Sequence, residues 1–339
     1  MQRRTLLRRA ALLPLLCLDL PRAFAASGAS AAYAAASAAP SVPARAPRVV
    51  VLDWGLVETL LAMGVMPAGV AEIDSYNASV VAPAVPRGVT DVGLRLAPSL
   101  ELLQQIAPDL ILINSSQESQ REMLERIAPV RAFAVYTDAG SPYRRSCEVT
   151  LQLGKLCKRE AAAQALIDGT QHAIDTARAR LDHARTSAHD EHDAHDALGP
   201  AAPLYLIRFF DGRHVGVYGA RSLFQDVMDA LALRNAWRGP TDYWGIGVAG
   251  LEQLAGAPDA GLLYFDPLPA GVDRQLASNR LWRALPPVAG GRVAALPPFW
   301  GFGMLPSAAR FADALADALT AALATAPHEP SALRDPQHT

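Results

Sequence analysis

Residues 144–185 read RRSCEVTLQLGKLCKREAAAQALIDGTQHAIDTARARLDHAR, and this stretch decides the fold. It contains no proline and only two glycines, and its apolar residues recur at helical spacing. A helix of about 40 residues, rising about 1.5 Å per residue, can cross a whole domain. We therefore predict one long helix, or a kinked pair of helices, and assign residues 143–184 as a connector between two lobes.

The segment before this helix, residues 47–142, alternates short apolar runs with helical patterns. Gly64 marks the end of the first of these helices. Such alternation is typical of βαβ units, so we expect an N-terminal lobe with a largely parallel sheet. The expected elements are strands at 48–52, 109–113 and 131–136, and helices at 56–63, 99–106 and 118–127.

The same alternation of short apolar runs and helical patterns returns after the connector, in residues 203–326. Asp211-Gly212-Arg213-His214 falls between two apolar runs and predicts a hairpin turn. The expected elements are strands at 204–210, 215–218, 262–265 and 292–296, and helices at 222–233 and 311–324. The fold class is therefore α/β, with two lobes that each hold a mainly parallel sheet and flanking helices. A single-helix connector permits only small hinge motions, so we expect a largely pre-formed ligand site.

The N-terminus has the pattern of an export signal. Arg3-Arg4-Thr5-Leu6-Leu7-Arg8 resembles the twin-arginine motif, an apolar run follows at 10–18, and Ala23-Phe24-Ala25 fits a cleavage site. Removing residues 1–25 takes away five arginines and one aspartate, which lowers the formal net charge from −2 to −6. We expect a periplasmic protein. Residues 26–46 predict an Ala/Ser/Pro-rich flexible tether, and residues 327–339 a polar tail.

Several function classes lack their sequence signals. The acidic balance argues against nucleic acid as a partner. There is no Gly-x-Ser-x-Gly elbow, no phosphate-binding Gly-x-x-x-x-Gly-Lys-Ser/Thr loop and no His-Glu-x-x-His pair, which argues against an enzyme. Cys147 and Cys157 lie about 15 Å apart along the expected helix, too far for a disulfide.

A His/Asp-rich segment, residues 185–202, separates the connector from the second lobe. His189, His192 and His195 would share one face if this segment were helical, and imidazoles among carboxylates can bind Zn²⁺ or Ni²⁺. Large apolar residues are almost absent, however, and structural metal sites take their ligands from ordered elements. We interpret the segment as a disordered insertion, with a weak metal site as the alternative.

Two aromatic loops and one cationic loop are the candidate ligand-binding motifs. The loops TDYWGIG at 241–247 and PPFWGFG at 297–303 place bulky aromatics among small residues, the second directly after a strand. Loops that follow parallel strands are where α/β folds bind ligands. DVGLR at 91–95 adds Arg95, whose planar fork suits anionic oxygens.

At these motifs the chain resembles the periplasmic ferric-hydroxamate (ferrichrome-type) binding proteins of ABC importers, within the helical-backbone class of solute receptors. The resemblance covers about residues 47–325 and rests on the order of several short segments. These are VLDW 51–54, VE 57–58, LLAMGV 60–65, DVGLR 91–95, LELL 100–103, EML 122–124, RIAP 126–129, SLFQ 222–225, NAW 235–237, YWG 243–245 and FW 299–300.

The resemblance implies roles for individual residues. Arg95 would hydrogen-bond the hydroxamate oxygens around the iron, and Trp244 and Trp300 would wall the cleft, with no metal ligand and no intrinsic cofactor from the protein. A receptor must present both of its lobes to one permease, so we also expect a monomer. Further pocket residues implied are Asp242, Tyr243 and Phe302, and the permease-docking carboxylates are Glu122 and Glu252.

The chain also departs from the family's pattern. Gln117 stands where the family has a pocket tyrosine, and Ser79, with Tyr76 close by, stands where it has a tryptophan. Phe302 replaces a tyrosine. These changes favour a hydroxamate other than ferrichrome, or a mixed citrate–hydroxamate siderophore.

The sequence leaves three other interpretations of the function open. The same fold would serve for another iron chelate, or for a corrinoid or haem. A secreted α/β hydrolase acting on siderophores would need a nucleophile and a base, for which Ser115 or Ser116 with His214 is the loose candidate. A metal-scavenging protein would use the His-rich segment.

Overall fold

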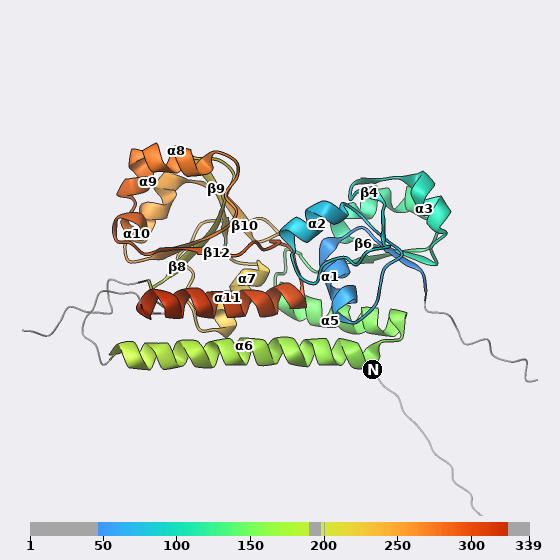
Figure 1. Cartoon of the computed structure of the whole chain (residues 1–339), viewed down its shortest axis with the longest axis horizontal. Helices are drawn as coiled ribbons and strands as arrows, with labels where there is room; N and C mark the ends of the chain where they lie inside the picture. The colour runs from blue at the N-terminus through green and yellow to red at the C-terminus, as the bar shows by residue number, and fades with distance from the viewer. Residues whose placement is uncertain (1–46, 190–197, 200, 325–339) are drawn as a thin grey trace, which may run out of the picture. The chain divides into compact units, whose positions relative to one another are not determined.

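A computed structural model of the chain describes residues 47–189, 198, 199 and 201–324 (Figure 1). The predicted leader and tether, the tail and most of the His-rich segment lie outside the described residues. His192, His195 and the side chain of His189 therefore also lie outside the described part of the chain. Among the helices that are described, none is long and apolar enough to cross a membrane.

The first lobe is built on a five-stranded parallel sheet in the order β3-β2-β1-β6-β7. Its central strand β1 pairs Val51 with Val70 on one side and with Leu112 on the other. The strands are β1 (Val49–Val51), β2 (Gly69–Val70), β3 (Thr90–Asp91), β6 (Leu110–Asn114) and β7 (Val130–Phe133). The predicted parallel sheet is confirmed.

Both faces of this sheet are covered, because successive side chains of a strand point to opposite faces. Val49 and Val51 pack into the core that contains α1, whereas Val50 packs with Ile111 and Leu103 on the other face. The helices are α1 (Trp54–Ala62), α2 (Ile73–Ser79), α3 (Leu100–Ile106) and α4 (Arg121–Leu124), with a 3₁₀ turn η1 at Ser115–Gln120. The helix predicted at 118–127 is wrong in type and extent, since a 3₁₀ turn and one short helix occupy that stretch.

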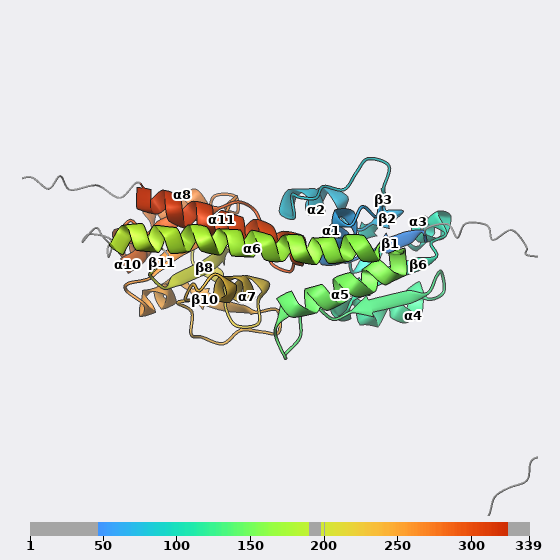
Figure 2. The ribbon, with the colours of Figure 1, turned by 90° about the horizontal axis from the view of Figure 1, so that it is seen from below.

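The predicted long helix between the lobes is confirmed as α6 (Glu160–His189), but the first part of the stretch forms a separate helix, α5 (Pro142–Cys157), that packs against α6, so residues 143–184 are neither one helix nor a kinked pair. Lys158 ends α5 in the left-handed region, at φ 56° and ψ 46°, and the Arg159 N–H caps the Gly154 carbonyl at 2.7 Å. The chain then returns past α5 at an angle as α6 (Figure 2). Of these two helices, α6 is the one that links the lobes.

The second lobe has a mixed sheet in the order β10-β9-β8-β11-β12. Strands β8, β11 and β12 are parallel, and β9 is antiparallel to both of its neighbours. The strands are β8 (Leu204–Phe209), β9 (His214–Tyr218), β10 (Ile246–Gly250), β11 (Gly261–Phe265) and β12 (Val293–Leu296). Asp211 closes the β8–β9 hairpin by accepting the N–H groups of Arg213 and His214, which confirms the predicted turn.

The helices of this lobe are α7 (Leu223–Ala230), α8 (Val272–Ser278), α9 (Arg280–Ala284), α10 (Pro286–Ala289) and α11 (Leu305–Ala324), with a 3₁₀ turn η2 at Leu251–Gly256. Helix α11 begins six residues earlier than the predicted 311, because Pro306 fits the first turn of a helix, where no N–H is needed. α11 packs along α6 (Figure 1).

The chain just before α11 makes buried contacts with the first lobe. Glu58 of α1 is fully buried and accepts hydrogen bonds from the Met304 N–H and, at 2.7 Å, from the Ser307 hydroxyl. The Tyr136 hydroxyl donates to the Gly303 carbonyl at 2.7 Å. A carboxylate at the start of α11 also meets the positive end of the helix dipole. These contacts join the first lobe to the loop that carries the second aromatic motif.

Candidate functional site

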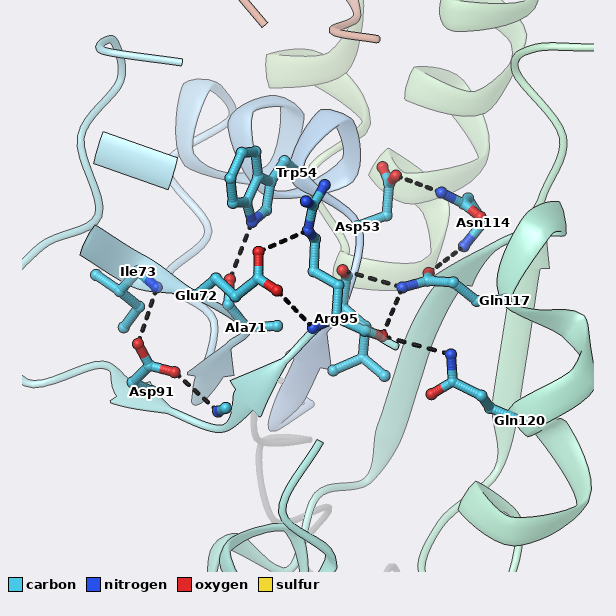
Figure 3. Close-up of polar contacts among 12 residues, drawn as sticks. Asp53, Trp54, Ala71, Glu72, Ile73, Asp91, Arg95, Asn114, Gln117 and Gln120 are labelled. Carbon is cyan, nitrogen blue, oxygen red and sulfur yellow. Dashed lines mark hydrogen bonds and ion pairs between the residues drawn. The ribbon is translucent and has the colours of Figure 1, made fainter. Parts of the chain in front are cut away.

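Arg95 lies at the tip of a small hairpin between β4 (Gly93–Leu94) and β5 (Ala97–Pro98). Gly93 permits the turn, since its φ is 87°. The Asp91 carboxylate holds the turn by accepting the Gly93 N–H at 2.8 Å and the Ile73 N–H at 2.9 Å (Figure 3). The hairpin is therefore fixed to the start of α2.

The Arg95 side chain is held by a carboxylate and by aromatic rings. Glu72 accepts from Nε of Arg95 at 2.9 Å and from its backbone N–H at 3.2 Å. The guanidinium carbon lies 3.9 Å from the Trp54 ring centroid and 4.8 Å from that of Trp300. Stacking on an aromatic face adds a cation–π attraction to the ion pair. A cation from the first lobe thus meets an aromatic side chain from the second.

Gln117 lies behind Arg95, with only 2% of its surface exposed. Its amide donates to the Arg95 carbonyl at 3.0 Å and to the Leu52 carbonyl at 3.2 Å, and its oxygen accepts the Asn114 N–H at 3.0 Å. Gln120 also donates to the Arg95 carbonyl, at 3.4 Å. In this conformation Gln117 fixes the backbone of Arg95 and does not form part of the pocket surface.

The aromatic residues of the two loops gather into one cluster. The Trp244 and Phe302 ring centroids lie 4.6 Å apart, and those of Trp300 and Phe302 5.1 Å apart. Tyr136 of the first lobe joins them, 5.5 Å from Trp244. Tyr243 is 37% exposed and packs 4.7 Å from Trp244. The structure therefore brings together four aromatic residues of the two loop motifs, whereas Phe299 of the second motif packs in the core.

Trp54 and Tyr136 belong to the site although the sequence reasoning did not select them. The Trp54 and Trp300 centroids lie 4.6 Å apart, and the Trp54 indole N–H donates to the Ala71 carbonyl at 2.9 Å. Both residues follow the C-terminal end of a parallel strand, and that position was the available signal.

A small hollow beside Tyr136, Trp244 and Phe302 is lined by side chains from both lobes. The lining residues are Asp53, Leu56, Asn114, Ser115, Phe133, Val135, Tyr136, Trp244, Phe302 and Met304. Asp53 caps α1 by accepting the Leu56 N–H at 2.9 Å, and it accepts from the Asn114 amide at 2.7 Å. Burial raises the pKa of Asp53, and these hydrogen bonds and the Arg95 charge oppose that rise.

Two other expected pocket residues support their neighbours. Tyr76 is fully buried, donates its hydroxyl to the Pro83 carbonyl at 2.8 Å and packs edge-on to Trp54. Asp242 is exposed, and its carboxylate accepts the N–H groups of Trp244 and Ile246 at 2.9 and 3.0 Å. Each holds a cluster aromatic, or the loop that carries one, in place.

Of the remaining candidates, Ser115 lies at the hollow and the others lie apart from it. Glu122 is 93% exposed on α4 of the first lobe, and Glu252 is exposed on η2 of the second. Ser115 lines the hollow, whereas His214 pairs with Asp211 at the β8–β9 hairpin. Within the described part of the chain, no group of three or more His, Cys, Asp or Glu side chains is placed to hold a metal ion.

Two known siderophore-binding proteins are similar to this chain over most of its length. The iron(3+)-hydroxamate-binding protein FhuD of Escherichia coli is 33% identical over 272 residues, which cover 80% of this chain and 86% of that protein. The siderophore-binding protein FhuD of Vibrio cholerae, solved with Fe³⁺-Desferal bound, is 32% identical with a TM-score of 0.74, over 81% of this chain and 98% of that one.

A more distant structure matches in fold alone. The triscatecholate siderophore-binding protein FeuA of Bacillus subtilis is 15% identical with a TM-score of 0.62, over 82% of this chain and 94% of that one.

Residues 49–299 match the family model described as periplasmic binding protein. The two lobes linked by α6, with Arg95 and the aromatic cluster between them, therefore belong to a member of the periplasmic binding protein family.

Proposed function

We propose that this chain is the substrate-binding protein of an ABC importer, and that it binds a ferric hydroxamate siderophore between its lobes. The observation that carries the proposal is Arg95, stacked on Trp54 and facing Trp300 across the lobes. Guanidinium N–H groups suit the hydroxamate oxygens that surround the iron. The siderophore fills the metal's coordination sphere, so the protein supplies no metal ligand.

The neighbouring aromatic side chains supply the rest of the site. Trp244, Trp300, Phe302 and the exposed face of Tyr243 would pack on the apolar arms of the siderophore, because pockets of this kind are mainly apolar with a few placed polar groups. Gln117, Tyr76 and Asp242 hold these contact residues in position. Binding without turnover, and not catalysis, is the activity proposed.

The proposed role as a substrate-binding protein also predicts where the chain acts and which partner it meets. We propose export to the periplasm by the twin-arginine route and delivery as a monomer to an inner-membrane permease. Glu122 and Glu252 lie one on each lobe and are exposed, as residues that dock onto arginines of a permease must be.

Intrinsic tryptophan fluorescence tests the binding proposal. Titration with ferric hydroxamates should quench Trp244 and Trp300 saturably, since an iron complex would lie against them. Arg95→Ala should weaken binding roughly tenfold to a hundredfold, the cost of losing hydrogen bonds from a charged donor. Arg87→Ala, which removes an exposed arginine of the same lobe, is the matched control and should bind like wild type.

The other ligand classes are outcomes of the same titration. Quenching by haem or cobalamin, and by no ferric hydroxamate, would keep the fold and reject the proposed ligand. Recovery of a cleaved siderophore after incubation with the protein would reject a pure binding role.

A further inference from the structure

Glu72 occupies an unusual backbone position between β2 and α2. Its φ is 55° and its ψ 53°, a left-handed conformation that residues other than glycine seldom adopt. Neighbouring hydrogen bonds hold it there, because the Glu72 N–H donates to the Gly93 carbonyl at 2.9 Å and the Ile73 N–H donates to Asp91. The same two contacts tie Glu72 to the hairpin that carries Arg95.

The Glu72 carboxylate is fully engaged with Arg95. One oxygen accepts the Arg95 backbone N–H and the other accepts from Nε, so Glu72 holds the Nε side of the guanidinium (Figure 3). Among the described residues, no hydrogen bond from an Nη group of Arg95 to Glu72 is present. The rings of Trp54 and Trp300, centred 3.9 and 4.8 Å from the guanidinium carbon, restrict the orientation of the group, and the Glu72 carboxylate does not occupy its Nη edge.

The charges around Arg95 do not favour an anionic ligand. Glu72 neutralises the guanidinium, with 20% of its side chain exposed and 29% of that of Arg95. Asp53 also lies close enough to interact electrostatically with Arg95. One cation therefore faces two carboxylates at the first-lobe wall of the site.

We propose that Glu72 is the positioning residue for Arg95, and that its charge makes the site discriminate against ferric complexes that carry additional negative charge. The inference rests on the proposed function and narrows its substrate class. Three hydroxamate anions balance Fe³⁺, so a plain ferric trihydroxamate core is neutral. Ferric complexes that carry further carboxylates are anionic and are repelled by Glu72, whereas neutral and cationic complexes meet no such cost.

The experiment uses one iron complex in three charge states. Ferric desferrioxamine B is taken with its terminal amine free, acetylated or succinylated, which gives a cationic, a neutral and an anionic complex with the same iron centre. Dissociation constants are measured by tryptophan quenching for wild type, Glu72→Gln and Glu72→Ala. Glu160→Gln, an equal charge change at an exposed position in the first turn of α6, is the control.

The two parts of the proposal have separate readouts. In Glu72→Gln, the ratio of the succinylated to the acetylated dissociation constant should fall roughly threefold to tenfold, because one nearby negative charge is gone. A glutamine oxygen still accepts from Nε, so the neutral complex should bind within about threefold of wild type. Glu72→Ala removes the acceptor and should weaken the neutral complex by about tenfold. Glu160→Gln should leave the ratio unchanged.

Each contrary result has one meaning once thermal melts show that the variants are folded. An unchanged ratio in Glu72→Gln overturns the charge role. Wild-type affinity of Glu72→Ala for the neutral complex overturns the positioning role. A wild-type protein that binds none of the three complexes contradicts the proposed function itself.

Discussion

A single buried carboxylate, Glu58, makes the stability of the folded chain depend on pH. Burial raises its pKa from 4.5 to about 7, against the opposing effect of hydrogen bonds from Met304 and Ser307. The folded state therefore binds more protons than the unfolded state between about pH 4.5 and 7. Stability from this group is present at the acidic end of that window and is lost as the pH rises through it.

We expect the free energy of unfolding to be lower at pH 8 than at pH 5, with Glu58 contributing on the order of 2–3 kcal/mol to the difference. Urea unfolding at both pH values measures it. Glu58→Gln keeps an acceptor without a titrating proton and should show a smaller difference. The raised pKa of Asp53 also lowers the stability as the pH rises, but it does so in both proteins, so it does not explain a difference between them. An equal difference in the two proteins would show that Glu58 does not titrate in this range.

At the scale of elements, the α5–α6 pair depends on close packing at Gly154. A Cβ added there would lie 2.6 Å from Cβ of Ala163, and Ala163 is fully buried. Gly154→Ala should therefore push the two helices apart and destabilise the chain by about 1–3 kcal/mol. Urea unfolding measures the loss.

Gly169, in the middle of α6, provides the control for that substitution. A Cβ there would meet nothing within 4 Å, so Gly169→Ala should leave stability unchanged or raise it by up to about 1 kcal/mol through helix propensity. If both substitutions have the same effect, close packing at Gly154 is not what joins the helices.

Local sequence patterns predicted the elements whose signals are local. The apolar run at β1 marked a buried parallel strand, and the glycine-flanked tryptophans marked the aromatic loops. The break at Lys158 was missed because no proline marks it and lysine has no preference for the left-handed region. Glu72 was missed because its partner, Arg95, lies 23 residues along the chain. Contacts of that kind depend on how a hairpin docks on a helix, which periodicity does not encode.

At the scale of the whole folded unit, the lobes are held by two kinds of connection. Helix α6 passes α5 of the first lobe and packs on α11 of the second, so the link is a continuous helix and not a flexible crossing. Beside it, Glu58 and Tyr136 are hydrogen-bonded to the Gly303–Ser307 corner in buried surroundings. A large hinge rotation would have to break these bonds and leave a buried carboxylate without partners, at a cost of several kcal/mol.

We therefore expect ligand binding to change the lobe arrangement little. Small-angle scattering of the folded chain, with and without a saturating ferric hydroxamate, should give radii of gyration that agree within error. Glu58→Ala, which removes the acceptor for both Met304 and Ser307, is the informative variant, because it should allow a larger change on binding. A marked compaction of the wild-type protein on binding would contradict the expectation, and would mean that the bonds at this corner exchange during closure.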